Sequence, residues 1–310
     1  MYRLSGSAQG TTYTLQVFDT NLNFSQKDID SILYAFDMKL STYVNTSLVS
    51  RFNQASFKDT LLKQQDAFTQ MLLLSDTIFN LTDGYFDPSI KPIIDIWGFG
   101  DGRENIPSKH SLDSARKLVG YAKGLHFDFH IVGETILFQK KTPSFQLDFN
   151  AIAQGYSVDL LMKFIKSKGH EDVYIELGGE IKLSGTKGQN KKWKIGVETP
   201  RENNLTSEQV VHSAFSLSDC AIATSGNYRK YFIKDGELYA HTINPKTGKQ
   251  NRHQLLSATV VSESCAFSDA LATYFMVVGL DQSKLFLEKH TDLAVEVYFI
   301  LLSVYNINVI

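Results

Sequence analysis

Strand patterns and helix patterns follow one another along this chain without a regular strand–helix–strand alternation, and this order constrains the fold most. Alternating apolar and polar runs such as "TTYTLQVFD" and "VYIELGGEIKLSG" predict strands. Four segments, 25–41, 65–82, 151–169 and 268–279, have apolar residues at helical spacing. We therefore expect an α+β fold, a mostly antiparallel sheet with packed helices, in a single domain spanning residues 1–310.

Two segments have less regular patterns. Residues 84–100, "GYFDPSIKPIIDIWGFG", are dense in turn-forming and aromatic residues and have no clean period, which predicts a shaped loop. The C-terminal run "LAVEVYFILLSVYNINVI" is apolar, but Glu296 interrupts it and Val, Ile and Tyr are frequent. This composition favours a buried pair of strands over a membrane helix.

Composition and charge exclude few classes of protein. A chain of 310 residues that is 43% hydrophobic can bury a sizeable core. The formal net charge of −2 gives no basic excess, which argues against nucleic acid or an anionic membrane as partner. Cys220 and Cys265 are expected to be buried thiols, so the redox compartment stays open. The first residues lack a basic and an apolar leader region and read as the start of a folded domain.

The helix predicted at 268–279 carries an oxygen-rich pair. Asp269 and Thr273 are four residues apart, so both face one side of the helix. A carboxylate and a hydroxyl at this spacing can hold a hard cation such as Mg²⁺. Alternatively, Asp269 complements the start of its own helix and Thr273 is incidental. From the spacing alone, the second interpretation is favoured.

Residues 147–159, "LDFNAIAQGYSVD", enter a predicted helix through small residues and carry a carboxylate near each end. A helix N-terminus attracts phosphate, and small side chains let a phosphate or a metal approach a backbone carbonyl. Equally, Gly155 and the alanines could allow close packing of the helix on the sheet. The stretch matches neither GxGxxG nor a Walker A loop, so ordinary nucleotide-binding folds are not supported.

Further candidates lie in turns. Tyr43 in a polar turn could stack on a flat ring, or be an ordinary half-buried tyrosine. Phe86 and Asp87 precede Pro88 and could recognise a ring with hydrogen-bond donors, or form only a capped turn. His241 could act as a general acid or base, or donate a hydrogen bond to a phosphate, although a lone histidine is more often structural. Residues 224–226, Thr-Ser-Gly, offer hydroxyls and N–H groups to an anion.

The order of these motifs resembles the ApbE family of FAD:protein FMN transferases over about residues 5–295. The motifs that carry the resemblance are "SGSAQGTTY", "LSTYVNTS", "GYFDPSIKPIIDIWGFG", "LDFNAIAQGYSVD", "IELGGEI", "ATSGNYRKYF", "HTINPKTG" and "SDALATYFMVVG". The resemblance implies an ApbE-like, T-fold-related architecture. It also implies an enzyme that uses FAD and Mg²⁺, transfers FMN to a threonine or serine hydroxyl of a target protein, and releases AMP.

The resemblance also implies roles for single residues. Asp269 and Thr273 match the family's metal ligands, with the backbone carbonyl of Ala151 as the third. His241 and Asp269 are the implied catalytic residues, and the family does not decide which group accepts the threonine proton. The positions implied to contact FAD are Gln9, Tyr43, Tyr85, Phe86, Asp87, Gln154 and Asp159.

The chain departs from the family pattern at three positions. The family often has Met where this chain has Gln9, Lys where it has Gln154, and Asp where it has Asn244. Without the lysine, one positive charge is lost near the FAD phosphates, which affects FAD affinity or the balance between transfer and hydrolysis. A Mg²⁺-dependent FAD pyrophosphatase and a flavin-binding protein without turnover are therefore alternatives.

The family's partners and location complete the expectation. Acceptors in the family are flavin-bearing subunits of membrane redox pumps and related exported proteins. The resemblance therefore implies a protein of the bacterial periplasm or, as a lipoprotein, of the outer face of the cytoplasmic membrane, and the sequence leaves open whether a lipoprotein signal preceded residue 1. The acceptor of this chain and its oligomeric state do not follow from the sequence.

Overall fold

The computed structural model describes residues 1–54, 60–99, 103–122, 124–198, 211–227, 231–234, 237–251, 253–301 and 307–309. Contacts divide the chain into two compact units. The first comprises Met1–Tyr34, Ile152–Lys230 and Arg252–Ile310, and the second comprises Ala35–Ala151 and Tyr231–Asn251. Neither unit is one continuous stretch of chain, and the single-domain prediction stays a prediction.

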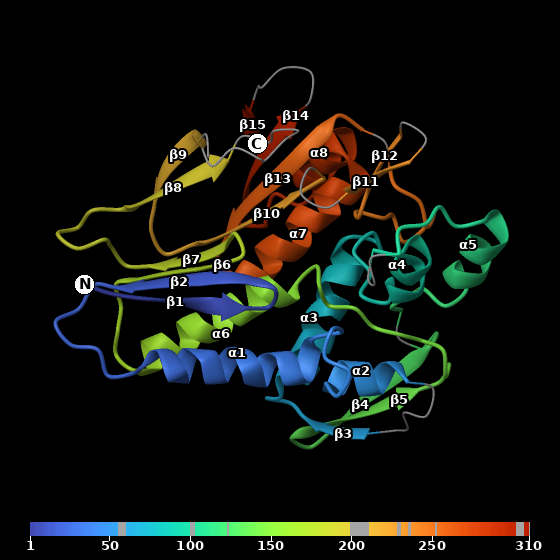
Figure 1. Ribbon diagram of the computed structural model, residues 1–310, viewed down its shortest axis with the longest axis horizontal. Coiled ribbons are helices and arrows are strands. Elements are labelled where there is room, and N and C mark those ends of the chain that lie inside the picture. The colour runs from blue at the N-terminus through green and yellow to red at the C-terminus, as the bar shows by residue number, and fades with distance from the viewer. Residues whose placement is uncertain are drawn as a thin grey trace. The chain divides into compact units, whose positions relative to one another are not determined.

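The first unit is built on an eight-stranded sheet in which every paired neighbour is antiparallel (Figure 1). Its strands, in spatial order, are β1 (Tyr2–Ala8), β2 (Thr11–Val17), β6 (Val173–Leu177), β7 (Glu180–Ser184), β10 (Ala221–Gly226), β13 (Leu255–Ser262), β14 (Glu296–Leu301) and β15 (Ile307–Val309). Strands β6 and β7 form a hairpin around Gly178 and Gly179, as "VYIELGGEIKLSG" predicts.

Helices α6 (Ala153–Ser167) and α7 (Cys265–Val278) pack on this sheet and on each other. The core beneath α6 joins its apolar stripe to inward residues of β2 and β6 and to the first turns of α1 (Gln26–Leu40). The opposite face of the sheet is covered by the hairpin of β8 (Trp193–Glu198) and β9 (Val211–Leu217), with Trp193 buried at 3% exposure. A short helix α8 (Leu280–Lys289) follows α7.

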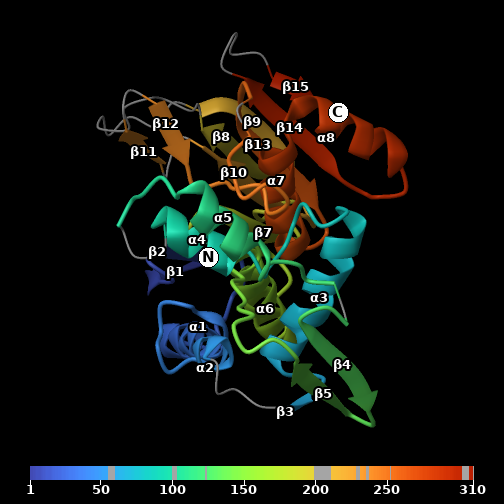
Figure 2. The ribbon, with the colours of Figure 1, turned by 90° about the vertical axis from the view of Figure 1, so that its right-hand side faces the viewer.

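The second unit combines helices with two small sheets, which can be followed in Figure 2. Its core is rich in aromatic rings; among them, Phe138 contacts both Phe52 and Phe127. The elements are α2 (Leu48–Asn53), α3 (Ala67–Leu81), α4 (Lys91–Trp97), α5 (Lys109–Arg116), the sheet of β3 (Thr60–Lys63), β5 (Thr135–Lys140) and β4 (Phe127–Val132), and the hairpin of β11 (Tyr231–Lys234) and β12 (Glu237–Ala240).

The predicted α+β class with a mostly antiparallel sheet is confirmed, while two details are corrected. The segment 84–100 is not all loop, because α4 forms within it. Pro92 suits the first turn of this helix, and Gly98 ends it with a left-handed φ of 77°. Helix α7 begins three residues before the predicted start, at Cys265, after its N-cap Ser264.

The expected C-terminal strand pair forms as β14 and β15. Among the described residues, no helix is both long enough and apolar enough to span a membrane.

Candidate functional site

The first turns of α6 and α7 meet at Gly155. A Cβ at this position would lie 2.4 Å from the backbone oxygen of Cys265 and 2.8 Å from the nitrogen of Ala266. Real Cβ atoms do not approach backbone this closely, so only glycine permits the contact. Gly155 therefore serves close packing, here of one helix start on another.

Asp159, one turn further along α6, caps α7. Its Oδ1 accepts a hydrogen bond from the nitrogen of Cys265 at 3.1 Å, and its Oδ2 accepts one from the nitrogen of Ala266 at 3.0 Å. Ser264 Oγ donates to Oδ2 at 2.9 Å, and Lys182 Nζ pairs with Oδ1 at 2.8 Å. Asp159 thus satisfies N–H groups that a helix leaves unpaired at its start.

Asp269, on α7, in turn faces the start of α6. Its Oδ2 accepts a hydrogen bond from the nitrogen of Gly155 at 3.1 Å. The residue is 7% exposed, and this burial raises the pKa of its carboxyl group to about 7, although the Gly155 bond opposes the shift. Asp269 is the fifth residue of α7, and Ser264 and Asp159 cap that helix, so Asp269 does not complement its own helix start.

Thr273 lies one turn after Asp269 on α7, as the four-residue spacing predicts. Its Oγ1 lies 3.0 Å from Oγ of Ser225, the fifth residue of β10. The preceding residue of β10, Thr224, pairs its hydroxyl with that of Thr259 on β13 at 2.8 Å. The described part of this unit therefore places the buried carboxylate of Asp269 and the hydroxyls of Thr273 and Ser225 along α7.

Two glutamines of the first unit contribute amide groups. Gln9 has a left-handed φ of 52°, and its Oε1 accepts a 3.4 Å hydrogen bond from Oγ of Ser157 on α6. Its Nε2 is buried, and the described residues give it no hydrogen-bond partner. Gln154 lies over the β6–β7 turn, where a Cβ at Gly178 would be 2.7 Å from its Nε2. A buried N–H donor without a partner suits an oxygen-rich ligand.

The second unit holds a buried carboxyl group in the loop before α4. Asp87 is 8% exposed, and its Oδ1 accepts hydrogen bonds from Ser89 N at 2.8 Å and Ser89 Oγ at 2.5 Å. Tyr121 N donates to its Oδ2 at 3.3 Å. Burial outweighs these bonds and raises the pKa of Asp87 to about 6. Its contacts are those of a carboxyl that orders its own loop.

Two tyrosine rings of the second unit, those of Tyr43 and Tyr85, are more accessible. Tyr43 is 66% exposed, so its ring is available for stacking, while loss of water around the hydroxyl and then the charge of Asp148 raise its pKa. The nitrogen of Asp148 donates to the oxygen of Pro88 at 2.7 Å, which ties this stretch to the Asp87 loop. Lys246 Nζ lies 4.0 Å from the ring centre of Tyr85 and pairs with Asp83 at 2.8 Å.

The similarity to known sequences decides the family. A sequence model described as the ApbE family matches residues 9–299. The chain belongs to the ApbE family. The resemblance drawn from eight short motifs is thereby confirmed over nearly the whole chain.

Curated ApbE relatives are similar over most of their length. A protein of Vibrio cholerae named FAD:protein FMN transferase is 32% identical over 282 residues, which is 89% of this chain and 81% of the relative. One of Haemophilus influenzae with the same name is 31% identical over 93% of this chain and 83% of the relative.

Solved ApbE structures are similar in fold. The flavin transferase ApbE from Vibrio cholerae has a TM-score of 0.82 at 29% identity, with 100% of this chain and 96% of that chain covered. The apo form of the Pseudomonas stutzeri flavinyl transferase ApbE has a TM-score of 0.83 at 30% identity, with 100% and 93% covered. These values confirm the predicted ApbE-like architecture.

The predicted site residues of this ApbE chain divide between the two units. Asp269, Thr273, Gln9, Gln154 and Asp159 belong to the first unit. Tyr43, Tyr85, Phe86, Asp87, His241 and Ala151 belong to the second unit.

Within the second unit, the ring of Phe86 is buried at 3% exposure, in contrast to that of Tyr43. His241 is half-buried directly after β12. Their assigned roles stay predictions.

Several residues that shape these groups had no predicted role from the sequence. Lys182 and Ser264 both donate hydrogen bonds to the carboxylate of Asp159, and they come close to it only in the folded chain. Asp148 is the first carboxylate of the stretch "LDFNAIAQGYSVD", so the signal was present, but its position beside Tyr43 and Pro88 required the structure. Lys246 lies in the quoted motif "HTINPKTG", whose lysine could have been considered for the Tyr85 loop.

The first unit offers oxygen ligands for a cation. The described residues contain no group of three or more His, Cys, Asp or Glu side chains placed to hold a metal ion. The predicted set does not need one, because it combines one carboxylate with a hydroxyl and a backbone oxygen. Buried Asp269 and the Thr273 hydroxyl one turn later fit the oxygen chemistry that Mg²⁺ prefers.

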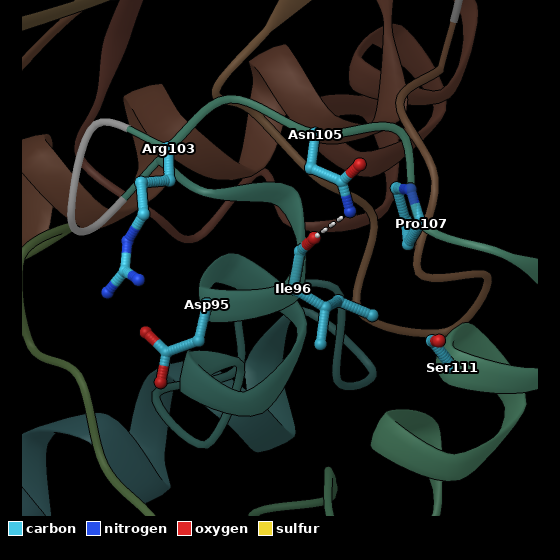
Figure 3. Close-up of a pocket in the computed structure, with 6 residues that line it drawn as sticks. All are labelled: Asp95, Ile96, Arg103, Asn105, Pro107 and Ser111. Carbon is cyan, nitrogen blue, oxygen red and sulfur yellow. Dashed lines mark hydrogen bonds between the residues drawn. The ribbon is translucent and has the colours of Figure 1, made fainter.

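A separate cavity of about 470 Å³ lies in the second unit (Figure 3). Its described lining contains none of the predicted site residues and comprises Asp95, Ile96, Arg103, Asn105, Pro107 and Ser111. Asp95 is already paired with Lys91 at 2.7 Å, and Asn105 Nδ2 donates to the oxygen of Ile96 at 3.4 Å. This cavity is therefore not the candidate site.

Proposed function

We propose that this protein is an FAD:protein FMN transferase. A threonine or serine hydroxyl of a target protein attacks the FMN-side phosphorus of the FAD pyrophosphate, the bond to the AMP oxygen breaks, and the hydroxyl proton leaves. The observation that carries the proposal is the name shared by relatives that are 31–32% identical over about nine tenths of the chain. The oxygen-rich first turns of α7 agree with this chemistry.

Residues of this chain would hold Mg²⁺ through oxygen. We assign Asp269 and Thr273 as side-chain ligands and the backbone oxygen of Ala151, just before the N-cap Ile152, as the third. Bound Mg²⁺ would neutralise charge on the pyrophosphate and on the departing AMP. Asp269 is suited to this because a buried carboxylate gains most from a cation, which offsets the loss of its hydration.

The remaining assigned residues would bind and orient FAD. Tyr43 offers an exposed ring for the flavin, and the Tyr85–Asp87 loop would contact the dinucleotide. The Nε2 of Gln9 offers a buried donor, and Gln154 and Asp159 would lie along the FAD-binding start of α6. For Asp159 this contact adds to its bonds with α7. His241 is the candidate acceptor of the hydroxyl proton.

The acceptor and the location follow the family. We propose that the acceptor is an exported flavoprotein, such as a subunit of a redox pump, and that the protein acts in the bacterial periplasm or, as a lipoprotein, on the outer face of the cytoplasmic membrane. Transfer to such targets requires the enzyme on the same side of the membrane.

The test incubates the protein with FAD, Mg²⁺ and a small domain that carries an acceptor threonine, and weighs the acceptor by mass spectrometry. The expected result is a mass gain of one FMN that EDTA abolishes and that a threonine-to-alanine acceptor does not show. FMN and AMP in solution without a labelled acceptor would replace the proposal with an FAD pyrophosphatase. If FAD stays intact when several acceptor proteins of the family are offered, the remaining interpretation is a flavin-binding protein without turnover.

A further inference from the structure

The hydroxyl of Thr273 is held differently from that of Thr77, another helical threonine. In α3, Thr77 Oγ1 donates to the oxygen of Leu73 at 3.2 Å, which is the usual bond of a helical threonine to the carbonyl four residues earlier. Among the described residues, Thr273 Oγ1 instead has its hydrogen bond with Ser225 Oγ on β10, at 3.0 Å. Its rotamer is therefore set by the strand beneath the helix.

The strand that supplies Ser225 is paired with β13 at that residue and with β7 at its first two residues, Ala221 and Ile222. Strand β10 pairs with β7 and with β13, and Ser225 stands opposite Ala258 in the β13 register. Successive side chains of a strand point to opposite faces. Thr224 accordingly pairs with Thr259, while Ser225 reaches α7, which packs on β10.

A hydroxyl that gives a lone pair to a cation must direct its own proton away from that cation. The proton then needs an acceptor, because an unmade hydrogen bond in a part-buried position costs free energy. Ser225 Oγ is at the right distance from Thr273 Oγ1 to accept it. With Thr273 as the donor, this bond fixes the rotation of its hydroxyl and leaves the lone pairs of Thr273 facing away from β10.

We propose that Ser225 is a positioning residue for the metal site, which accepts the Thr273 hydroxyl proton and orients the Thr273 oxygen toward the cation. The inference rests on the proposed function, because it assigns Thr273 as a ligand. Groups that orient metal ligands typically change metal affinity about 10- to 100-fold when removed.

The test measures binding of the metal alone, with Mn²⁺ as a paramagnetic substitute for Mg²⁺. Free Mn²⁺ is followed by electron paramagnetic resonance during titration of the wild type, Ser225→Ala, Ser225→Thr and Thr224→Val. We expect Ser225→Ala to weaken Mn²⁺ binding about 10-fold. Ser225→Thr keeps a hydroxyl at this position and should bind Mn²⁺ with the affinity of the wild type. Thr224→Val removes the neighbouring hydroxyl and its bond with Thr259, and should also bind Mn²⁺ like the wild type.

A second readout separates positioning from general damage. The Mg²⁺ concentration for half-maximal FMN transfer should rise in Ser225→Ala, while the rate at saturating Mg²⁺ stays close to that of the wild type. Equal Mn²⁺ affinities in Ser225→Ala and the wild type, with binding lost in Asp269→Asn, would overturn the role of Ser225 and leave the proposed function standing. Wild-type protein that takes up no Mn²⁺ would overturn the assigned metal site and, with it, the role of Ser225.

Discussion

Asp159 and Asp269 each accept hydrogen bonds from the start of the other's helix. Asp159 of α6 receives the N–H groups of Cys265 and Ala266 at the start of α7. Asp269 of α7 receives the N–H group of Gly155 in the first turn of α6. Since a helix N-terminus carries partial positive charge, each carboxylate also lies in a favourable field. These reciprocal hydrogen bonds hold the N-termini of α6 and α7 together, and Asp269 itself is one of the proposed metal ligands.

The two carboxylates should respond differently to substitution, and Asp159 is expected to act on stability. Asp159→Ala removes the acceptor for two N–H groups and leaves Lys182, 19% exposed, without its ion pair. We expect a loss of about 3 kcal/mol in the free energy of unfolding, measured by urea denaturation. The control is Glu171→Ala, which removes an exposed ion pair with Lys166 and should change stability by less than about 0.5 kcal/mol. A similar small change in Asp159→Ala would show that the cap is dispensable.

Asp269→Asn should instead keep the fold and lose the reaction. The amide oxygen can still accept the Gly155 bond. Burial raises the carboxyl pKa to about 7, so the ionised form disfavours folding at pH 8 and the neutral amide removes that cost. We expect thermal stability at pH 8 equal to or above that of metal-free wild type. Mg²⁺-dependent FMN transfer should fall at least about 100-fold, since a metal ligand contributes several kcal/mol. Transfer at the wild-type rate would remove Asp269 from the site.

Gly155 tests the contact between the two helix starts. In Gly155→Ala the new Cβ would meet the backbone oxygen of Cys265 at 2.4 Å, and backbone on both sides must shift. Overpacking of this kind typically costs about 1–3 kcal/mol, even though alanine favours a helix more than glycine does. Lys163→Ala, at an exposed position of α6, serves as the control for a change to alanine in the same helix. If Gly155→Ala proved more stable than the wild type, helix propensity would outweigh the contact.

Sequence periodicity predicted the elements around this junction well, because each depends on local spacing. Helix α6 follows its apolar stripe and ends at Ser167, directly before Lys168 and Gly169. The four-residue step from Asp269 to Thr273 places Asp269 against the start of α6 and Thr273 against β10. Helix α4 was missed, since its seven residues lie among turn formers and its signals are Pro92 and Gly98 alone.

The partners of the site residues could not be predicted from spacing. Asp159 and Cys265 are 106 residues apart, and Ser225 and Thr273 are 48 apart, so only the packed sheet brings them into contact. Whether Gly155 serves packing or a ligand was likewise open in the sequence. The close approach of Cys265 to Gly155 answers this in favour of packing, which also places Gly155 N on Asp269.

Asp87 should make the stability of the protein depend on pH between about 4 and 7. Burial raises its folded pKa from 3.8 to about 6, so the folded state binds the proton more tightly than the unfolded state. The stabilisation from protonation is fully present below the unfolded pKa and is lost as pH rises through the folded pKa. Asp87→Asn has no such proton and keeps an oxygen acceptor for Ser89.

Urea denaturation of the wild type and Asp87→Asn at pH 4.5 and 7.5 measures this effect. The stability of the wild type relative to the variant should be greater at pH 4.5 than at pH 7.5 by about 2 kcal/mol, since each pKa unit corresponds to about 1.4 kcal/mol. Asp113→Asn is the control, because its side chain is 52% exposed, and its stability should follow that of the wild type at both values. Parallel pH dependence in Asp87→Asn and the wild type would mean that the Asp87 carboxylate is stabilised in the fold as well as it is in water.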